Sequence, residues 1–370
     1  MANILFVTWD GAGNLPPALG IAAELQRRGE TVRFLGHEQQ RSMIEKVGMR
    51  FEPYSHSYPS SSTRATWPRW VASFVALVND RSLGRDLLAS IQRESTDLVV
   101  IDCVLRTVLR AAEEAGIRRA VLVHSFYYIG GFGMGSAGPI ARLRGRAATE
   151  PWGGADVGLI ATLRSLDPDG HKTLHPRIRF TGPVWQGTPQ PATQLSGEPR
   201  ILVSLSSGWF PGQDKALQHI LDALRSLQVR AVVTTGPAIR PDDLKVPVNA
   251  EVHSYLPHAD VLPTVSLVIG HGGHGTTMAA LSRDLPIIVL PMAKFMDQYK
   301  IGQVLEQAGA GRLLPKRSSP ARIRQVIEQV LGDDRCRLAA ARLGAEIRQQ
   351  DGASVAADAI AEVLARAVQT

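Results

Sequence analysis

The chain has 370 residues, a hydrophobic content of 44% and a formal net charge of +7 at neutral pH. These values predict a globular protein of two domains, and the lack of like-charge runs or basic–aromatic interleaving argues against nucleic-acid binding. Cys103 and Cys336 lie far apart without the spacing of a metal site, so free thiols in a reducing compartment are expected. Without a basic leader or an apolar run of about 18 residues, the sequence predicts a cytoplasmic protein with no transmembrane helix.

The first half of the chain alternates between apolar runs and helical patterns. Strands are predicted at 3–9, 30–36, 96–102 and 118–125, and helices at 16–29 and 104–116. This alternation is typical of a parallel, doubly wound sheet. Two irregular segments, 54–70 and 129–155, interrupt it, and loops of this length are usually functional or mobile.

The second half repeats the pattern after a stretch rich in Pro, Gly and Gln at 182–200. Strands are predicted at 200–208, 229–236, 250–257, 265–270 and 284–291, and helices at 214–227, 271–281, 318–331, 333–349 and 354–368. We therefore expect an α/β fold of two Rossmann-like domains, at 1–185 and 200–370, facing across a cleft and joined by a linker at 186–199. Packing of the final helix back on the first domain is left open as an alternative.

The stretch "HGGHGTTMAAL" at 271–281 joins a predicted strand to a predicted helix through a glycine-rich turn. Free backbone amides and the helix dipole make such a turn suitable for a phosphate, although a tight turn with a satisfied histidine is the plainer interpretation. Further polar residues follow neighbouring strands: Ser206, His258, Asp297 and Gln298. Each alone reads as a helix cap or a surface turn, whereas together they indicate one ligand-binding edge.

Residues 253–314, from "HSYLPHADVLP" through "HGGHGTTMAALSRDLPIIVLP" and "DQ" to "GAGRLL", resemble the donor-binding signature of family 1 glycosyltransferases, particularly bacterial natural-product enzymes. The opening "WDGAG…PPALGIAAELQRRG" fits the same family, and the arginine-rich composition is typical of GC-rich bacteria. The resemblance implies a GT-B fold and an inverting transfer from a nucleotide sugar, without a metal or other cofactor. By this resemblance the donor is held by Ser206, His258, His271, Gly273, Gly275, Thr276, Asp297 and Gln298.

Two positions depart from the family pattern. Ala279 stands where the family usually has a glutamate that binds the donor ribose, so a dTDP-sugar becomes plausible beside a UDP-sugar. Asn14 stands where the family has its catalytic histidine or aspartate, and an amide cannot act as a general base, so Asn14 is expected to orient the acceptor instead of deprotonating it. Asp10 is the first alternative base and Asp102, which matches the family's dyad aspartate, is the second; His124 and His56 are further imidazoles on this side.

Aromatic residues gather in the first half of the chain and suit a flat, apolar acceptor, although packing explains any single one of them equally well. The predicted acceptor contacts are Trp67, Trp70, His124, Phe126 and Tyr127. The acidic stretch "DPD" at 167–169 imitates a metal-binding motif, but its polar surroundings indicate a turn.

The predicted function is hexosyl or deoxyhexosyl transfer from a dTDP- or UDP-sugar to a hydrophobic, aromatic or polyketide-like natural product, as in antibiotic biosynthesis. The alternatives are transfer to a lipid-linked precursor at a membrane face and a degenerate sugar-nucleotide-binding auxiliary protein. A sugar-nucleotide 2-epimerase fits less well, because Asp297 has no companion carboxylates around the sugar. The expected partners are the nucleotide sugar and the small acceptor, and homodimerisation is left open.

Overall fold

The computed structural model describes residues 1–11, 13–56, 63–128, 152, 154–185, 191, 197–294 and 297–366. The chain separates into two compact units: Met1–Ser60, Val71–Gly187 and Gln350–Thr370 form the first, and Ser61–Trp70 and Thr188–Gln349 form the second. Most of the irregular segment predicted at 129–155 and of the linker predicted at 186–199 lies outside the described residues.

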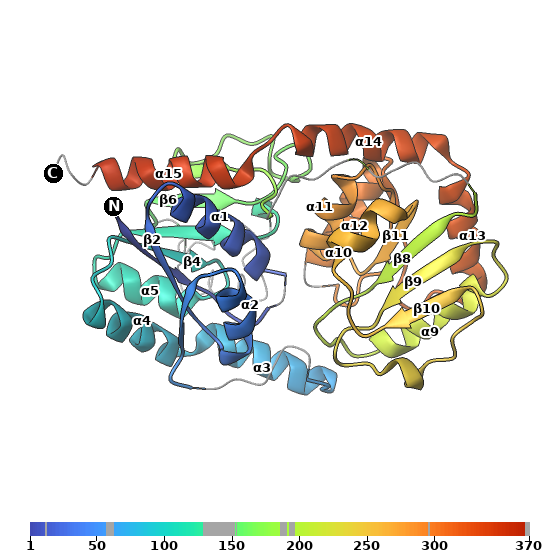
Figure 1. The fold of residues 1–370 in the computed structure, drawn as a ribbon, viewed down its shortest axis with the longest axis horizontal. Coiled ribbons are helices and arrows are strands. Elements are labelled where there is room, and N and C mark those ends of the chain that lie inside the picture. Colours follow the sequence, from blue (N-terminus) through green and yellow to red (C-terminus); the bar gives the residue numbers. More distant parts are fainter. Residues whose placement is uncertain are drawn as a thin grey trace. The chain divides into compact units, whose positions relative to one another are not determined.

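The first unit is built on a parallel sheet of seven strands in the order β3-β2-β1-β4-β5-β6-β7 (Figure 1). The strands are β1 Asn3–Val7, β2 Thr31–Gly36, β3 Arg50–Pro53, β4 Leu98–Asp102, β5 Arg119–Val123, β6 Val157–Ile160 and β7 Ile178–Phe180. The helices are α1 Leu15–Arg27, α2 Arg41–Lys46, α3 Trp67–Asn79, α4 Arg81–Arg93, α5 Arg106–Glu114 and α15 Gly352–Arg366, of which α3 begins in the second unit.

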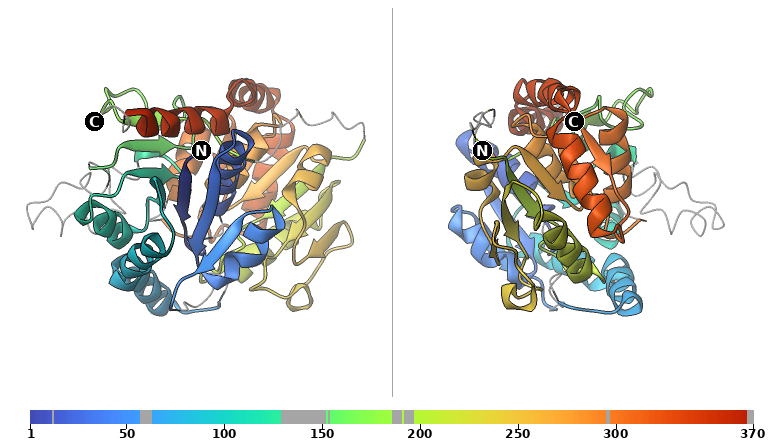
Figure 2. Two further views of the ribbon diagram at one scale, coloured as in Figure 1. Left: turned by 60° about the vertical axis from the view of Figure 1, so that its left-hand side comes forward. Right: turned by 90° about the vertical axis from the view of Figure 1, so that its right-hand side faces the viewer.

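Two apolar layers hold this sheet. One lies between the strands and helices α1 and α15, and it includes the buried side chains of Ile21, Ala357 and Ile360. The other lies against α4 and α5 on the opposite face, with Leu87 and Leu109 at its centre. Figure 2 shows both layers of helices from two further directions. Because both faces are covered, β4 and β5 are buried along their whole length, as expected of parallel strands.

The second unit has a parallel sheet of six strands in the order β10-β9-β8-β11-β12-β13. The strands are β8 Arg200–Ser204, β9 Arg230–Thr234, β10 Ala250–His253, β11 Leu267–Gly270, β12 Ile287–Val289 and β13 Gly311–Leu313. The helices are α9 Gln213–Leu224, α10 His258–Val261, α11 His274–Leu281, α12 Asp297–Gln307, α13 Pro320–Leu331 and α14 Asp334–Arg348. Helices α9 and α13 enclose the main core on one face, and α11 and α12 lie on the other (Figure 1).

Local signals in the sequence explain where several helices begin. Proline in the first turn of α1 and of α13 costs no hydrogen bond, because the first amides of a helix have no partner within it. Asp80 caps α4 by accepting a hydrogen bond from the amide of Ser82 at 2.7 Å. Asp333 caps α14 in the same way through the amide of Arg335 at 3.0 Å.

The predicted fold class is confirmed: the chain has two doubly wound, parallel α/β sheets of the Rossmann type. The sequence patterns identified β1, β2, β4 and β5 but did not identify the two helices at 67–93 or the short strands β3, β6 and β7. Helix α15 packs against α1 within the first unit. Residues 63–70, expected as part of an N-terminal loop, group with the second unit.

Candidate active site

Each sheet has one position where the strand order reverses, and ligands of doubly wound sheets bind at the carboxyl ends of the strands there. In the first unit the reversal falls between β1 and β4, and in the second between β8 and β11. Asn14 follows β1 and Asp102 ends β4, while Ser206 follows β8 and His271 follows β11. Predicted site residues therefore lie at the reversal point of both sheets.

The carboxylate of Asp102 is buried and fully hydrogen-bonded, with 4% of the residue exposed. Its Oδ1 accepts hydrogen bonds from Nε1 of Trp9 at 3.1 Å and from the amide of Val104 at 2.9 Å. Its Oδ2 accepts one from Nδ2 of Asn14 at 3.0 Å and lies 3.2 Å from Nδ1 of His124. The four lone pairs of the carboxylate are thus all directed at donors.

Asp102 and His124 form an ion pair at the ends of adjacent strands. Burial alone would raise the pKa of Asp102, but the positive charge and hydrogen bond of His124, with the amides of Val104 and Asn14, lower it. Burial alone would lower the pKa of His124, but the charge and hydrogen bond of Asp102, with Cys103, raise it well above its usual value. Both shifts favour the charged pair.

Cys103 lies beside this pair, with its Sγ 3.9 Å from Nδ1 of His124. The ligating atoms of Asp102, Cys103 and His124 are within 4.8 Å of one another, a grouping of the kind that can bind a metal ion. However, burial raises the pKa of the Cys103 thiol, and the lone pairs of Asp102 are already occupied. The group is therefore better described as an ion pair with a neighbouring neutral thiol.

Asn14 is held inside the turn after β1, with 1% of the residue exposed. Its Nδ2 lies at hydrogen-bonding distance from Oγ1 of Thr8, the carbonyl of Trp9 and Oδ2 of Asp102, whereas its Oδ1 is buried without a hydrogen bond within the described structure. In this conformation Asn14 positions the carboxylate. The sequence-based suggestion that it orients the acceptor stays a prediction.

Asp10 lies at the same turn next to a different imidazole. Its amide donates a hydrogen bond to Nδ1 of His37 at 3.1 Å, and its carboxylate acts on the charge of that ring. Burial lowers the pKa of His37 to about 4, so the ring is neutral near neutral pH. The structure thus links Asp10 with His37, and Asp102 with His124.

The predicted acceptor contacts have different surroundings. Phe126 is only 1% exposed, so its ring is part of the interior packing. Tyr127 is half-buried against Trp152 and Phe180, with ring centroids 6.2 and 6.4 Å away. The carboxylate of Asp167 accepts hydrogen bonds from the backbone amides of Tyr127, Tyr128 and Asp169, which is the turn-forming role expected of the "DPD" stretch.

Trp67 and Trp70 belong to the second unit, where they form an aromatic cluster with Phe210. The ring centroids of the two tryptophans are 5.6 Å apart, and Trp70 lies 5.4 Å from Phe210. Phe210 in turn lies 6.3 Å from the ring of His271. The cluster therefore reaches the glycine-rich turn of the predicted donor site.

That turn, between β11 and α11, depends on glycine. Gly272 has a φ of +83°, and a Cβ there would lie 2.6 Å from the carbonyl oxygen of Gln298. A Cβ at Gly275 would meet nothing within 4 Å. The first-turn amides of Gly275 and Thr276 in α11 lie where a helix has no carbonyl partner for them. The turn thus directs the backbone amides of Gly275 and Thr276 toward a place where an anion can bind.

His271 and His258 are both neutral near neutral pH. Burial, with a smaller contribution from the charge of His258, lowers the pKa of His271 to about 4. Nδ1 of His271 is buried and makes no hydrogen bond with the described residues. Burial also lowers the pKa of His258, whose Nε2 lies 3.1 Å from Oγ of Ser204. Ser206, a predicted donor contact, stabilises its own loop, because its Oγ accepts a hydrogen bond from the backbone amide of Gly208 at 3.1 Å.

Gln298 and Asp297 lie in the first turn of α12. The amide oxygen of Gln298 accepts hydrogen bonds from the backbone amides of Met292 and Ala293, at 2.7 and 3.0 Å. Only its Nε2 therefore remains to donate to a sugar hydroxyl. Ala279, on α11, is partly exposed and carries no polar side-chain atom toward a ribose.

Sequence reasoning missed residues that support both sites. Trp9, His37 and Gln40 hold the turn after β1, and Nε2 of Gln40 donates to the carbonyl of Trp9 at 2.8 Å. Lys316 joins two loops of the second unit by donating to the carbonyls of Pro211 and Met292, at 3.0 and 2.9 Å. The only available signal for His37 was its place directly after a predicted strand.

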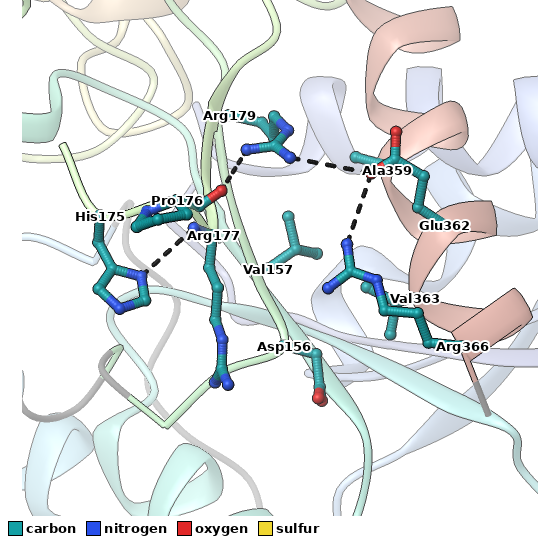
Figure 3. A pocket seen from close by; sticks show the side chains of 10 residues that line it. All are labelled: Asp156, Val157, His175, Pro176, Arg177, Arg179, Ala359, Glu362, Val363 and Arg366. Carbon is teal, nitrogen blue, oxygen red and sulfur yellow. Dashed lines mark hydrogen bonds and ion pairs between the residues drawn. The ribbon is translucent and has the colours of Figure 1, made fainter. Parts of the chain in front are cut away.

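The first unit also has a cavity of about 360 Å³ between β6, β7 and α15 (Figure 3). Its lining includes Arg177, Arg179 and Arg366, and the last two lie 3.8 and 3.6 Å from Glu362. Asp156 and His175 precede β6 and β7, so this cavity lies at the amino ends of the strands. Asp102 lies at the opposite, carboxyl edge of the same sheet, so the cavity is separate from the candidate site.

No helix among the described residues is long and apolar enough to cross a membrane.

Comparisons with known proteins agree with these observations. Residues 218–362 match the family described as erythromycin biosynthesis protein CIII-like, C-terminal domain. The chain is 26% identical to 4'-demethylrebeccamycin synthase of Lentzea aerocolonigenes, over 97% of this chain and 99% of the relative. The solved structure of the glycosyltransferase of kitacinnamycin is similar with a TM-score of 0.80 at 20% identity, covering 98% of this chain and 99% of that one.

The glycosyltransferase VinC, solved in complex with dTDP, is similar with a TM-score of 0.73 at 17% identity, covering 98% of this chain and 100% of that one. Other matches to this chain are also named as glycosyltransferases. The resemblance seen in the sequence is confirmed: the chain is a glycosyltransferase of two Rossmann-like domains, homologous to GT-B enzymes of the antibiotic and natural-product type.

Proposed function

We propose that the chain is an inverting, metal-independent glycosyltransferase that moves a sugar from a dTDP- or UDP-sugar to a hydrophobic, aromatic or polyketide-like small molecule. The nucleotide sugar is a co-substrate, and the reaction needs no other cofactor. Transfer forms a bond between the acceptor atom and the anomeric carbon, while the bond from that carbon to the diphosphate breaks.

The buried Nδ1 of His271, which makes no hydrogen bond with the described residues, is the observation that carries the donor side of this proposal. The neutral ring holds one proton, and its buried Nδ1 has no acceptor within the described structure. The proton is therefore best assigned to Nε2, which can donate a hydrogen bond to the leaving diphosphate. The backbone amides of Gly275 and Thr276 at the start of α11 add further donors, so the developing negative charge meets preorganised dipoles.

The remaining donor residues take roles that their contacts allow. His258, which contacts Ser204, lies beside the nucleoside of the donor. The diphosphate is bound by backbone and hydroxyl donors of Gly273, Gly275 and Thr276. The sugar hydroxyls form hydrogen bonds with Nε2 of Gln298 and with the carboxylate of Asp297. Ser206 fixes the loop after β8 by accepting a hydrogen bond from the amide of Gly208. The name of VinC's structure, in complex with dTDP, supports a thymidine nucleotide at such a site.

The hydrophobic acceptor is supported by the aromatic side chains at the predicted contacts. Trp67, which is 36% exposed, and the half-buried Tyr127 are the described aromatic rings best able to contact a flat molecule. We assign proton removal to the group around Asp102 at the ends of β1, β4 and β5.

Mass spectrometry of reaction mixtures tests the proposal. The purified chain is incubated with dTDP- and UDP-sugars and a library of aromatic aglycones, in excess chelator, and we expect an aglycone mass increased by one glycosyl residue. The H271A variant should lower kcat by about 10²–10³, the usual effect of losing one preorganised donor, while circular dichroism shows an unchanged fold. Transfer that needs added Mg²⁺ or Mn²⁺, or an unimpaired H271A, would contradict the proposal.

A further inference from the structure

The ion pair between Asp102 and His124 places one nitrogen of the imidazole on a buried carboxylate and leaves the other nitrogen available. Nδ1 of His124 is 3.2 Å from Oδ2 of Asp102 and 3.9 Å from Sγ of Cys103. Nε2 makes no hydrogen bond with the described residues, and it is not among their buried, unpartnered atoms. The side chain is 20% exposed, so Nε2 reaches the surface at the carboxyl edge of the sheet.

We propose that His124 is the general base of the reaction and that Asp102 and Asn14 are positioning residues that act through it. This inference rests on the proposed function and names the group that removes the acceptor proton. Nε2 takes the proton from the acceptor O–H or N–H as that atom bonds to the anomeric carbon, and the diphosphate leaves with the electron pair. The resulting imidazolium faces the Asp102 carboxylate and later returns its proton to water.

The surroundings of the pair support this division of roles. The amides of Val104 and Asn14 and the indole of Trp9 fix the carboxylate, so that it holds the ring in one orientation and one tautomer. Asn14 itself has no group that accepts a proton near neutral pH. Asp10 is tied through its amide to His37. Among the described residues, His124 thus combines a basic atom at the surface with a buried carboxylate behind it.

The titration of the pair gives the proposal a distinct signature. Among the described residues, the titratable groups that face His124 are Asp102, at the end of β4, and Cys103, directly after it. Two neutral side chains from the turn after β1, Asn14 and Trp9, donate hydrogen bonds to the same Asp102 carboxylate. Because Asp102 raises the pKa of His124, the neutral, active form accumulates only as pH rises above about 6.5. The acidic limb of kcat/KM should lie above that pH and move down in D102N.

Two substitutions distinguish His124 from Asp10, the alternative base. In H124N the amide nitrogen of the new side chain can replace Nδ1 as a donor to Asp102, while the atom at Nε2 is lost. We expect H124N to lower kcat by roughly 10²–10⁴, to lose the acidic limb and to bind dTDP as tightly as the original chain in calorimetry. D10N should lose less than about tenfold. A strongly reduced kcat in D10N, together with a nearly unchanged kcat in H124N, would overturn the proposal.

A readout without catalysis keeps this inference separate from the proposed function. In NMR of the chain with labelled histidine, the His124 resonance should titrate above 6.5 and shift to lower pH in D102N. Titration at or below 6.5, or no effect of D102N, would overturn the pairing even if transfer is observed. Correct titration without any transfer by the original chain would instead contradict the proposed function.

Discussion

The buried histidines show how one residue type takes opposite states within one chain. His124 has a carboxylate partner, which raises its pKa despite burial, whereas burial without such a partner at Nδ1 lowers the pKa of His271 to about 4. His37 behaves like His271, because burial outweighs the weaker attraction of Asp10 and Asp80. The neighbouring group, and not the extent of burial, decides which histidine can carry charge.

His37 predicts a specific loss of stability in acid. Its pKa of about 4 in the folded chain lies below the ordinary 6.5, so its contribution is present above pH 6.5 and is lost as pH falls toward 4. Between pH 7 and 5 the free energy of unfolding should fall by about 2 kcal/mol through this group. H37N keeps an acceptor for the amide of Asp10 but does not titrate. Urea unfolding at both pH values should show a shallower pH dependence in H37N, and equal dependence would contradict the assignment.

Ala279 leads to a prediction about the nucleotide. An alanine accepts no hydrogen bond from a ribose hydroxyl, so a deoxyribose donor loses nothing at this position. We expect dTDP and UDP to bind within about tenfold of each other in calorimetry, a difference of at most about 1.4 kcal/mol. The A279E variant should bind UDP more tightly relative to dTDP than the original chain does. If UDP already binds far more tightly, another residue reads the 2′-hydroxyl.

At the scale of elements, the turn between β11 and α11 combines two glycines with different tasks. Gly272 is required by its positive φ and by the carbonyl of Gln298, so its role is conformational. Gly275 lies in α11 with open space around it, so no neighbour in the described structure explains the missing side chain. A ligand that approaches the helix backbone would explain it.

This difference can be tested with two matched alanine variants. G275A should fold at least as stably as the original chain, because alanine favours a helix by about 0.5–1 kcal/mol, but should raise KM for the nucleotide sugar. G272A should lower thermal stability, because its Cβ has no room and its backbone is strained. Thermal melts and initial-rate kinetics compare the two. An unchanged KM in G275A would remove this position from the diphosphate site.

Elements with a strong local pattern could be predicted from the sequence, and those defined by tertiary contacts could not. The apolar runs of β1, β4 and β11 and the glycine turn after β11 were recognised because they carry their own signals. Strands β6 and β7 are short and form one end of the sheet, with β7 at its edge, and α3 begins within a segment rich in Ser, Pro and aromatics. The donor residues followed the family pattern, but the pairing of Asp102 with His124 depends on the neighbouring order of β4 and β5.

At the scale of the whole molecule, the C-terminal helix completes the first unit. The side chains of Ala356, Ala357 and Ile360 on α15 are fully buried in the layer that α1 forms with the sheet. The N-terminal core therefore depends on residues more than three hundred positions along the chain from β1. Stability of this unit should be sensitive to changes at the far end of the sequence.

Substitutions on α15 measure this dependence. I360A removes a fully buried side chain and should lower the free energy of unfolding by about 2–5 kcal/mol. V355A, on the same helix but 38% exposed, should change it by less than about 0.5 kcal/mol. Urea denaturation followed by circular dichroism compares them. Equal stability of the two variants would mean that α15 adds little to the core.

Neither unit is continuous in the sequence, since residues 61–70 group with the second and residues 350–370 with the first. This has a consequence for chimaeras that exchange donor specificity between homologous enzymes. A single junction in 186–199 would leave α15 and the Trp67–Trp70 segment with partners from the wrong parent. A working chimaera should therefore transplant residues 61–70 together with 188–349 and retain the C-terminal residues 350–370 of the recipient enzyme. The segments to be exchanged are thus defined by their packing and not by the position of the linker.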